Sequence, residues 1–248
     1  MADREKIVSY LNDLLNISEF EDYCVNGMQV EGEKNVKKIV LGVSVSQRLF
    51  QQAIKKKADM IIVHHGIFWK SDPHPFSLTG IFRERLALLI KNNINLLAYH
   101  LPLDAHPEFG NNAQIMNLLN IESIKPVDVG LLGQLKSKIE WEAFVDLVNE
   151  KVETKAQIFK YGPEYVLRVL VLSGGSSGFY KLAKENNADT FIGGEIKENI
   201  VRELEEVGIN YINAGHYNTE RFGVRALAKI VVDKFTIDCK FVDVPNPV

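Results

Sequence analysis

Short apolar runs alternate along the chain with segments whose apolar residues recur at helical spacing. Helices are predicted over 3–15, 47–57, 82–92, 111–119, 141–151, 178–187, 197–207 and 221–233. Strands are predicted over 38–43, 60–63, 94–99, 166–172, 190–192, 209–212 and 239–244. The polar stretches 19–32 and 122–138 read as connections, because Gly, Pro and Asn-Gly signals interrupt them. The alternation predicts an α/β fold with mainly parallel sheets.

Two adjacent histidines follow the apolar run Met60–Val63. In open α/β sheets, ligands bind at the carboxyl ends of the strands, which is where His64 and His65 stand. Side chains alternate along a strand, so the two imidazoles diverge unless the backbone turns. Diverging imidazoles suit two metal ions better than chelation of one. The alternative is one buried, hydrogen-bonded histidine beside an exposed one.

The two halves of the chain are related by an ungapped match. Residues 38–65 align with 168–195 at an offset of 130, and each block reads strand, turn, helix, Ala-Asp, strand. This match predicts an internal duplication, with two similar interlocked lobes at 1–125 and 126–248. The terminal segment 239–248 is expected to pack back on the first lobe.

A second pair of motifs extends the repeat. His100 and Asp104 are spaced as His216 and Glu220 are, at an offset of 116. Paired lobes would bring both sets of strand ends to one cleft. That cleft would hold four imidazoles and two carboxylates: His64, His65, His100, His216, Asp104 and Glu220.

Five or six nitrogen and oxygen ligands exceed what one tetrahedral ion takes, and they suit two ions bridged by a carboxylate. Because the set contains no thiolate, the candidates are Zn, Fe, Mn, Co or Ni. Cys24 and Cys239 are far apart in the sequence, which excludes a cysteine-based zinc site and fits a reducing compartment.

Bulk properties narrow the functional classes. The formal net charge is -3, so no basic excess favours nucleic acid as a partner. The charged start of the chain lacks the apolar core of a signal peptide, and no apolar run reaches the roughly 20 residues of a membrane span. These features predict a cytoplasmic protein without a membrane partner.

Four motifs carry a resemblance to the Nif-three-like family, whose members are often labelled GTP cyclohydrolase 1 type 2 homologues. The motifs are Val63–Lys70 (VHHGIFWK), His100–Pro107 (HLPLDAHP) with Gly110–Asn112, Gly215–Arg221 (GHYNTER) and Asp243–Pro247 (DVPNP). The resemblance extends over essentially the whole chain. It implies two α/β lobes, a dinuclear metal site and a ring-shaped homohexamer.

The ligands that the resemblance implies fall on five positions, of which the last would bridge the two ions: His64, His65, Asp104, His216 and Glu220. His100 is not among them and is predicted to act next to the ligands. Glu195, which falls on His65 in the internal alignment, is predicted to act as a general base or to orient a ligand.

Two further segments keep two interpretations each. The turn Ser173–Gly178 follows a strand and precedes a helix, which fits either anion binding or a tight βα turn. The aromatic residues Phe68, Trp69 and Phe76 lie in the additional segment 67–80, where they would either stack on a ring of a ligand or pack in a loop or an oligomer contact.

The favoured function is a metal-dependent hydrolase in which His100 or Glu195 moves protons. The resemblance suggests a purine nucleotide, or another small anionic molecule, as the substrate. The alternative is a metallochaperone or a regulatory metal-binding protein without turnover, because the same ligands would serve it.

Overall fold

The structure, a computed structural model, describes residues 1–73 and 77–248, so the predicted stacking residue Phe76 lies outside the described residues. The chain divides into two compact units. Unit 1 comprises Met1–Leu103 and Val224–Val244. Unit 2 comprises Asp104–Gly223 and Pro245–Val248.

This grouping differs from the lobes 1–125 and 126–248 that the sequence predicts. Residues between 104 and 125 group with unit 2, because helix α5 (Asn111–Leu118) contacts strands β7 (Glu122–Val127) and β8 (Gly130–Glu140). The short helix α4 (Leu101–Ala105) and the long helix α9 (His216–Phe235) carry residues of both units.

Unit 1 is built on a five-stranded sheet in the order β13-β4-β5-β6-β2. Its strands are β13 (Asp238–Phe241), β4 (Lys38–Ser44), β5 (Met60–His65), β6 (Asn95–Ala98) and β2 (Gly27–Val30), and a separate pair joins β1 (Ala2–Asp3) and β3 (Asn35–Val36). The first four strands of the sheet run parallel, and β2 is antiparallel at the edge. The helices are α1 (Arg4–Leu14), the 3-10 turn η1 (Ile17–Glu19), α2 (Gln47–Lys55) and α3 (Gly80–Lys91).

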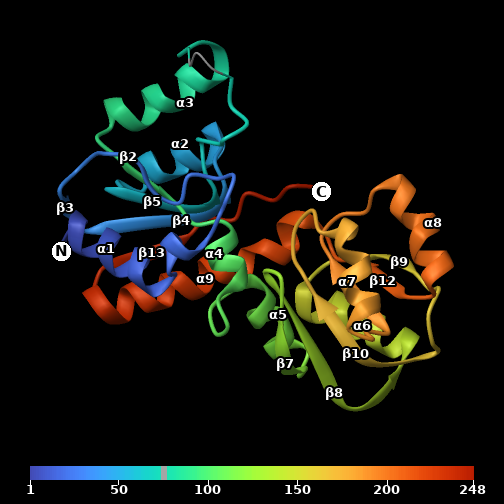
Figure 1. Cartoon of the computed structure of the whole chain (residues 1–248). Coiled ribbons are helices and arrows are strands. Elements are labelled where there is room, and N and C mark those ends of the chain that lie inside the picture. The colour runs from blue at the N-terminus through green and yellow to red at the C-terminus, as the bar shows by residue number, and fades with distance from the viewer. Residues whose placement is uncertain (74–76) are drawn as a thin grey trace. The chain divides into compact units, whose positions relative to one another are not determined.

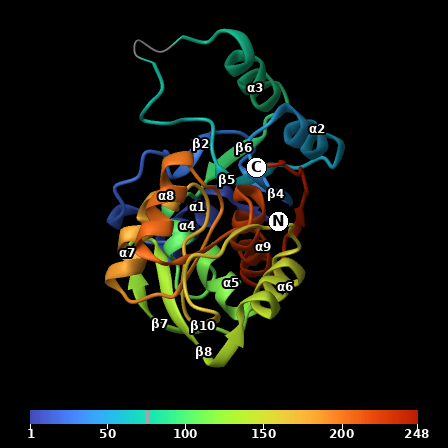
Figure 2. The ribbon, with the colours of Figure 1, turned by 90° about the vertical axis from the view of Figure 1, so that its right-hand side faces the viewer.

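Alternation along the central strands gives the sheet of unit 1 two buried faces. Val40, Ile61 and Val63 pack with the apolar sides of α2 and α3. Figures 1 and 2 both show these two helices side by side. The intervening residues, such as Leu41 and Ile62, are fully buried on the other face, where Figure 1 shows α1. A strand buried on both faces reads as a continuous apolar run, as 60–63 does.

Unit 2 is built on a six-stranded sheet in the order β7-β8-β10-β11-β12-β9. Its remaining strands are β9 (Gln157–Phe159), β10 (Tyr165–Val171), β11 (Thr190–Gly193) and β12 (Asn210–Asn213). Its other helices are α6 (Trp141–Val152), the 3-10 turn η2 (Ser177–Phe179), α7 (Tyr180–Glu185) and α8 (Glu198–Val207). Helices α5 and α6 cover one face and α7 and α8 the other, as Figure 2 shows. The predicted α/β fold is confirmed: β10, β11 and β12 run parallel, with antiparallel strands flanking them.

The expectation that 122–138 is a connection was wrong, because β7 and β8 form an antiparallel hairpin there. Strand β7 leaves five of its six residues exposed, so it lacks an apolar alternation. Position 133 within β8 requires glycine, because a Cβ there would come within 2.7 Å of the Glu122 carbonyl oxygen. A glycine that reads as a loop signal therefore serves close strand packing.

The two sheets repeat one another in hydrogen-bond detail. Asp59 accepts the backbone N–H groups of residues 37 and 38, and Asp189, 130 residues later, accepts those of 167 and 168. Asn95 likewise accepts the N–H of Gly32, as Asn210 accepts that of Gly162. These matches support the predicted duplication, which stays an inference. None of the described helices combines the length and the apolar character that crossing a bilayer requires.

Candidate metal centre

Three histidines meet at the carboxyl end of the unit 1 sheet. His64 and His65 end β5, and His100 follows β6, the neighbouring parallel strand. One nitrogen of each imidazole lies within 4.8 Å of one nitrogen of the others. His64 and His100 are buried and His65 is half-buried. The predicted grouping of these three residues is therefore present within unit 1.

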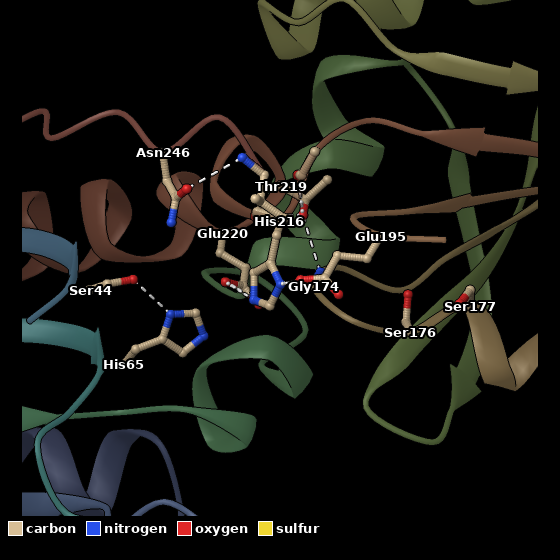
Figure 3. Close-up of polar contacts among 12 residues, drawn as sticks. Ser44, His65, Gly174, Ser176, Ser177, Glu195, His216, Thr219, Glu220 and Asn246 are labelled. Carbon is tan, nitrogen blue, oxygen red and sulfur yellow. Dashed lines mark hydrogen bonds and ion pairs between the residues drawn. The ribbon is translucent and has the colours of Figure 1, made fainter. Parts of the chain in front are cut away.

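The neighbours of His64 and His65 orient both rings. Nδ1 of His64 lies 2.9 Å from the carbonyl oxygen of Tyr99. A carbonyl only accepts, so Nδ1 carries the proton and Nε2 keeps its lone pair, the form that ligates a metal. Nδ1 of His65 lies 2.9 Å from the hydroxyl of Ser44, on the adjacent strand β4 (Figure 3). In both rings Nδ1 is therefore engaged in a hydrogen bond, and Nε2 is the nitrogen that would ligate a metal.

His100 is held by Asp22, a residue that sequence reasoning missed. Its Nδ1 donates to Oδ1 of Asp22 over 2.9 Å. Asp22 also accepts the backbone N–H groups of Cys24 and Leu101 and the amide of Asn26. Burial opposes ionisation of Asp22, but these donors outweigh it and hold the pKa of that carboxyl well below its usual range. The only signal in the sequence was an acidic residue in a polar segment.

We expect Asp22→Ala to destabilise unit 1 by roughly 2–4 kcal/mol, because it leaves several buried donors without their charged acceptor. Urea unfolding of the metal-free chain measures this. Glu21→Ala is the matched control, since Glu21 is the exposed neighbour, and its effect should stay within about 0.5 kcal/mol. Equal destabilisation by both variants would contradict the role given to Asp22.

The aromatic residues near the histidines divide into two roles. Trp69 packs beside His100 and His65, with ring centroids 5.3 Å and 6.0 Å away, and its Nε1 donates to the carbonyl of Gly66. Phe68 is half-buried and packs against Phe82 of α3 at the edge of the core cluster of that face. Trp69 therefore packs beside the histidine cluster, whereas Phe68 contacts α3.

In unit 2, Asp104 is buried and fixed by two donors. Oδ1 of Asp104 accepts the amide of Asn111 over 2.8 Å and the hydroxyl of Ser173 over 3.0 Å. Asn111 also accepts the backbone N–H of Gly223 in α9, which ties Asp104 to the helix that carries Glu220. Carboxylate oxygens of Asp104 and Glu220 lie within 4.8 Å of each other.

His216 and Glu220 lie on one side of α9, because residues four apart in a helix are neighbours. The helix begins at His216, five residues before the predicted start, so both residues stand on its first two turns. Nε2 of His216 lies 3.0 Å from Oε2 of Glu220, and Nδ1 lies 2.5 Å from Oε1 of Glu195 (Figure 3). Burial opposes protonation of His216, but the two carboxylates outweigh it and raise the pKa to about 9.

The backbone of the turn Ser173–Gly178 lies close to the candidate ligand Glu220. Gly174 has φ +65°, and a Cβ there would come within 2.3 Å of Oε1 of Glu220. The hydroxyl of Ser176 donates to the Leu172 carbonyl, and that of Ser177 accepts the N–H of Lys197. These bonds favour the tight βα turn over the anion site, because both hydroxyls already have local partners.

Comparison with known proteins gives a consistent result. The family model described as Duf34/NIF3 (NGG1p interacting factor 3) matches residues 2–247. The chain is 39% identical to the GTP cyclohydrolase 1 type 2 homologs of Haemophilus influenzae and Escherichia coli, over 96% of each chain. Among solved structures it resembles protein ybgI, described as of unknown function, with a TM-score of 0.96, 38% identity and complete coverage of both chains. It also resembles TTHA1606 from Thermus thermophilus, with a TM-score of 0.92 and 34% identity over both whole chains.

The sequence identities of 34–39% are high enough to show a common family and not only a common fold, and the matches cover nearly the whole chain. They confirm the family resemblance seen in the four sequence motifs. The chain belongs to the DUF34/NIF3 family.

Proposed function

We propose that the chain is a metal-dependent hydrolase with two divalent ions per chain. His64 and His65 supply imidazole ligands from unit 1. Asp104, His216 and Glu220 would supply a second group of ligands from unit 2, with Glu220 as the residue that would be shared between the ions. The donors are all nitrogen and oxygen atoms, so Zn, Fe, Mn, Co and Ni are the candidate metals.

The observation that carries this proposal is the hydrogen bonding of the imidazole rings through Nδ1. His64 donates its Nδ1 proton to a backbone carbonyl, and His216 directs Nδ1 to a carboxylate. Metal-ligating histidines almost always give their other ring nitrogen to such acceptors, which fixes the ring and leaves the second nitrogen for the metal. A histidine that is buried only for packing does not require neighbouring histidines whose Nδ1 atoms are hydrogen-bonded in the same way.

The residues of the chain then take distinct roles. Two bound divalent ions would lower the pKa of a water and polarise the atom that leaves. His100, with Nδ1 held by Asp22, presents Nε2 for proton transfer. Glu195 orients His216 through the contact with Nδ1, which would leave Nε2 of the ring for a metal. Trp69 packs against the imidazoles of His65 and His100.

The nucleotide-like substrate rests on the name GTP cyclohydrolase 1 type 2 homolog that the curated relatives carry. A metal-binding protein without turnover would use the same ligands and is the alternative. The closed homohexamer implied by the resemblance is likewise a proposal.

We expect the purified chain to bind two divalent ions after saturation and desalting, as measured by elemental analysis. The loaded protein should then hydrolyse at least one nucleotide in a screen of ribonucleoside triphosphates, with product formation followed by chromatography. Binding of at most one ion would overturn the dinuclear site. Two ions with no hydrolysis of any nucleotide would favour the metal-binding alternative.

A further inference from the structure

Unit 2 contains a pocket of about 530 Å³ that lies beside the His216–Glu195 pair and is lined only by residues of that unit. Its size lies within the range of small-molecule sites. Most of the side chains that line it are polar, and the ones used below are Thr154, Lys155, Gln157, Glu195, Asn213 and Asn218. Glu195 lines the pocket and also contacts His216, so the pocket lies next to a candidate metal ligand within unit 2.

Backbone rather than side chains forms part of the wall. A Cβ at Gly194 would come within 2.8 Å of the Gly174 carbonyl oxygen, and one at Gly215 within 2.8 Å of the Asn218 amide. Gly215 also has φ +89°, a conformation that other residues rarely adopt. A larger residue at position 215 would displace the Asn218 amide, and one at position 194 would collide with the backbone of Gly174 and His216 beside the pocket.

The amide side chains are held in place by one another and by the backbone. Asn218 donates to the hydroxyl of Thr154 over 3.1 Å, and Thr154 in turn donates to the Ala214 carbonyl over 2.9 Å. Asn213 accepts the N–H of Gly215 and donates to the side-chain carbonyl of Gln157. Preorganised amides can donate and accept in one plane, which is how proteins recognise a planar ring with adjacent N–H, C=O or ring-nitrogen groups.

The end segment of the described chain closes another side of the pocket. The N–H of Tyr217 donates to the Val248 carbonyl over 3.0 Å, and the N–H of Val248 donates to the side chain of Asn246. The Pro-Asn-Pro sequence around Asn246 restricts the backbone of this segment. This part of the pocket lining is therefore joined to the start of α9 by the Tyr217–Val248 hydrogen bond.

The pocket is lined by one positively and one negatively charged side chain, Lys155 and Glu195, which differ in exposure. Lys155 is exposed and provides an ammonium group, whereas Glu195 is half-buried and already contacts His216. An anionic group would be repelled by Glu195 and attracted by Lys155. A ligand with a neutral hydrogen-bonding ring and a separate phosphate matches this arrangement.

We propose that this pocket binds the base of a nucleotide by its hydrogen-bonding edge, with the phosphate at Lys155 and the ring beside Glu195. The assignment rests on the proposed function and names the part of the chain that selects the substrate. The ring is read by Asn218, Gln157 and Asn213, so recognition does not require a metal.

Calorimetric titration of the metal-free chain with guanosine 5′-monophosphate and with ribose 5-phosphate tests the assignment. The nucleotide should bind at least about tenfold more tightly, since one well-placed pair of hydrogen bonds to a base edge gives about that discrimination. Asn218→Asp should remove most of this preference, because a carboxylate has no N–H to donate. Lys155→Ala should weaken both ligands by a similar factor. Lys136→Ala, an exposed lysine on β8, is the control and should change neither.

Equal binding of the two ligands, or no binding of the nucleotide to metal-free protein, would overturn the assignment. If Asn218→Asp loses its native circular dichroism spectrum, Gln157→Ala replaces it, since Gln157 is exposed and belongs to the short edge strand β9. Metal content is measured separately. If the chain binds the nucleotide but takes up no metal, the pocket assignment would be supported and the proposed hydrolase function would be contradicted.

Discussion

Glu220→Gln should weaken binding of both metal ions together, by at least about 10–100-fold, the loss typical of changes in residues that only support a metal site. Glu220 is 2% exposed, and its carboxylate lies 3.0 Å from His216 and within 4.8 Å of Asp104. Glutamine keeps the shape but loses the charge and one acceptor oxygen, so it cannot give an anionic oxygen to each of two ions. Metal titration of the variant, with occupancy read by elemental analysis, measures the loss.

His64→Ala is the comparison that separates a bridge from an end ligand. It removes one imidazole of unit 1 and should weaken mainly one ion. The fold should survive in Glu220→Gln, because unit 2 has apolar cores on both faces of its sheet. Two ions bound by Glu220→Gln with unchanged affinity would show that Glu220 is not the bridge, and the proposed dinuclear mechanism would be withdrawn.

Much of the fold follows from local pattern. The strands at 38–44 and 60–65 are recognisable because burial on both faces demands continuous apolar runs. The repeat was visible because Asp59 and Asp189 perform one task, which is to accept two backbone N–H groups before a central strand. A residue whose role depends on nearby backbone groups recurs at the equivalent position of each repeat, so it can be recognised from the sequence.

The features missed depend on contacts between distant segments. Asp22 meets His100 across 78 positions of sequence, and nothing near Asp22 announces that partner. The start of α9 at His216 was also missed, since the predicted helix began only where its apolar spacing became regular. The grouping of His64, His65 and His100 was foreseen because parallel strands end at a common edge, which is a rule of topology and not of side-chain packing.

Gly174→Ala should lower metal affinity at least about tenfold, although Gly174 offers no side chain to a metal. Its φ of +65° costs an L-residue about 1–2 kcal/mol. The new methyl carbon would lie 2.3 Å from Oε1 of Glu220, and something must move. The backbone of Gly174 is held, because its N–H donates to Thr219 and its carbonyl accepts the N–H groups of Ser176 and Gly194. The Glu220 carboxylate is therefore the group that shifts.

Gly178→Ala is the matched control within the same turn. No atom lies within 4 Å of a Cβ at Gly178, so this variant should bind metal as the parent chain does. Urea unfolding of both metal-free variants reports the backbone cost, and metal titration reports the displacement of Glu220. A Gly174→Ala chain that is destabilised but keeps full metal affinity would show that the glycine serves only the turn. Loss of affinity beyond that of Gly178→Ala, with the fold retained, would show that the close approach of backbone to Glu220 sets the ligand in place.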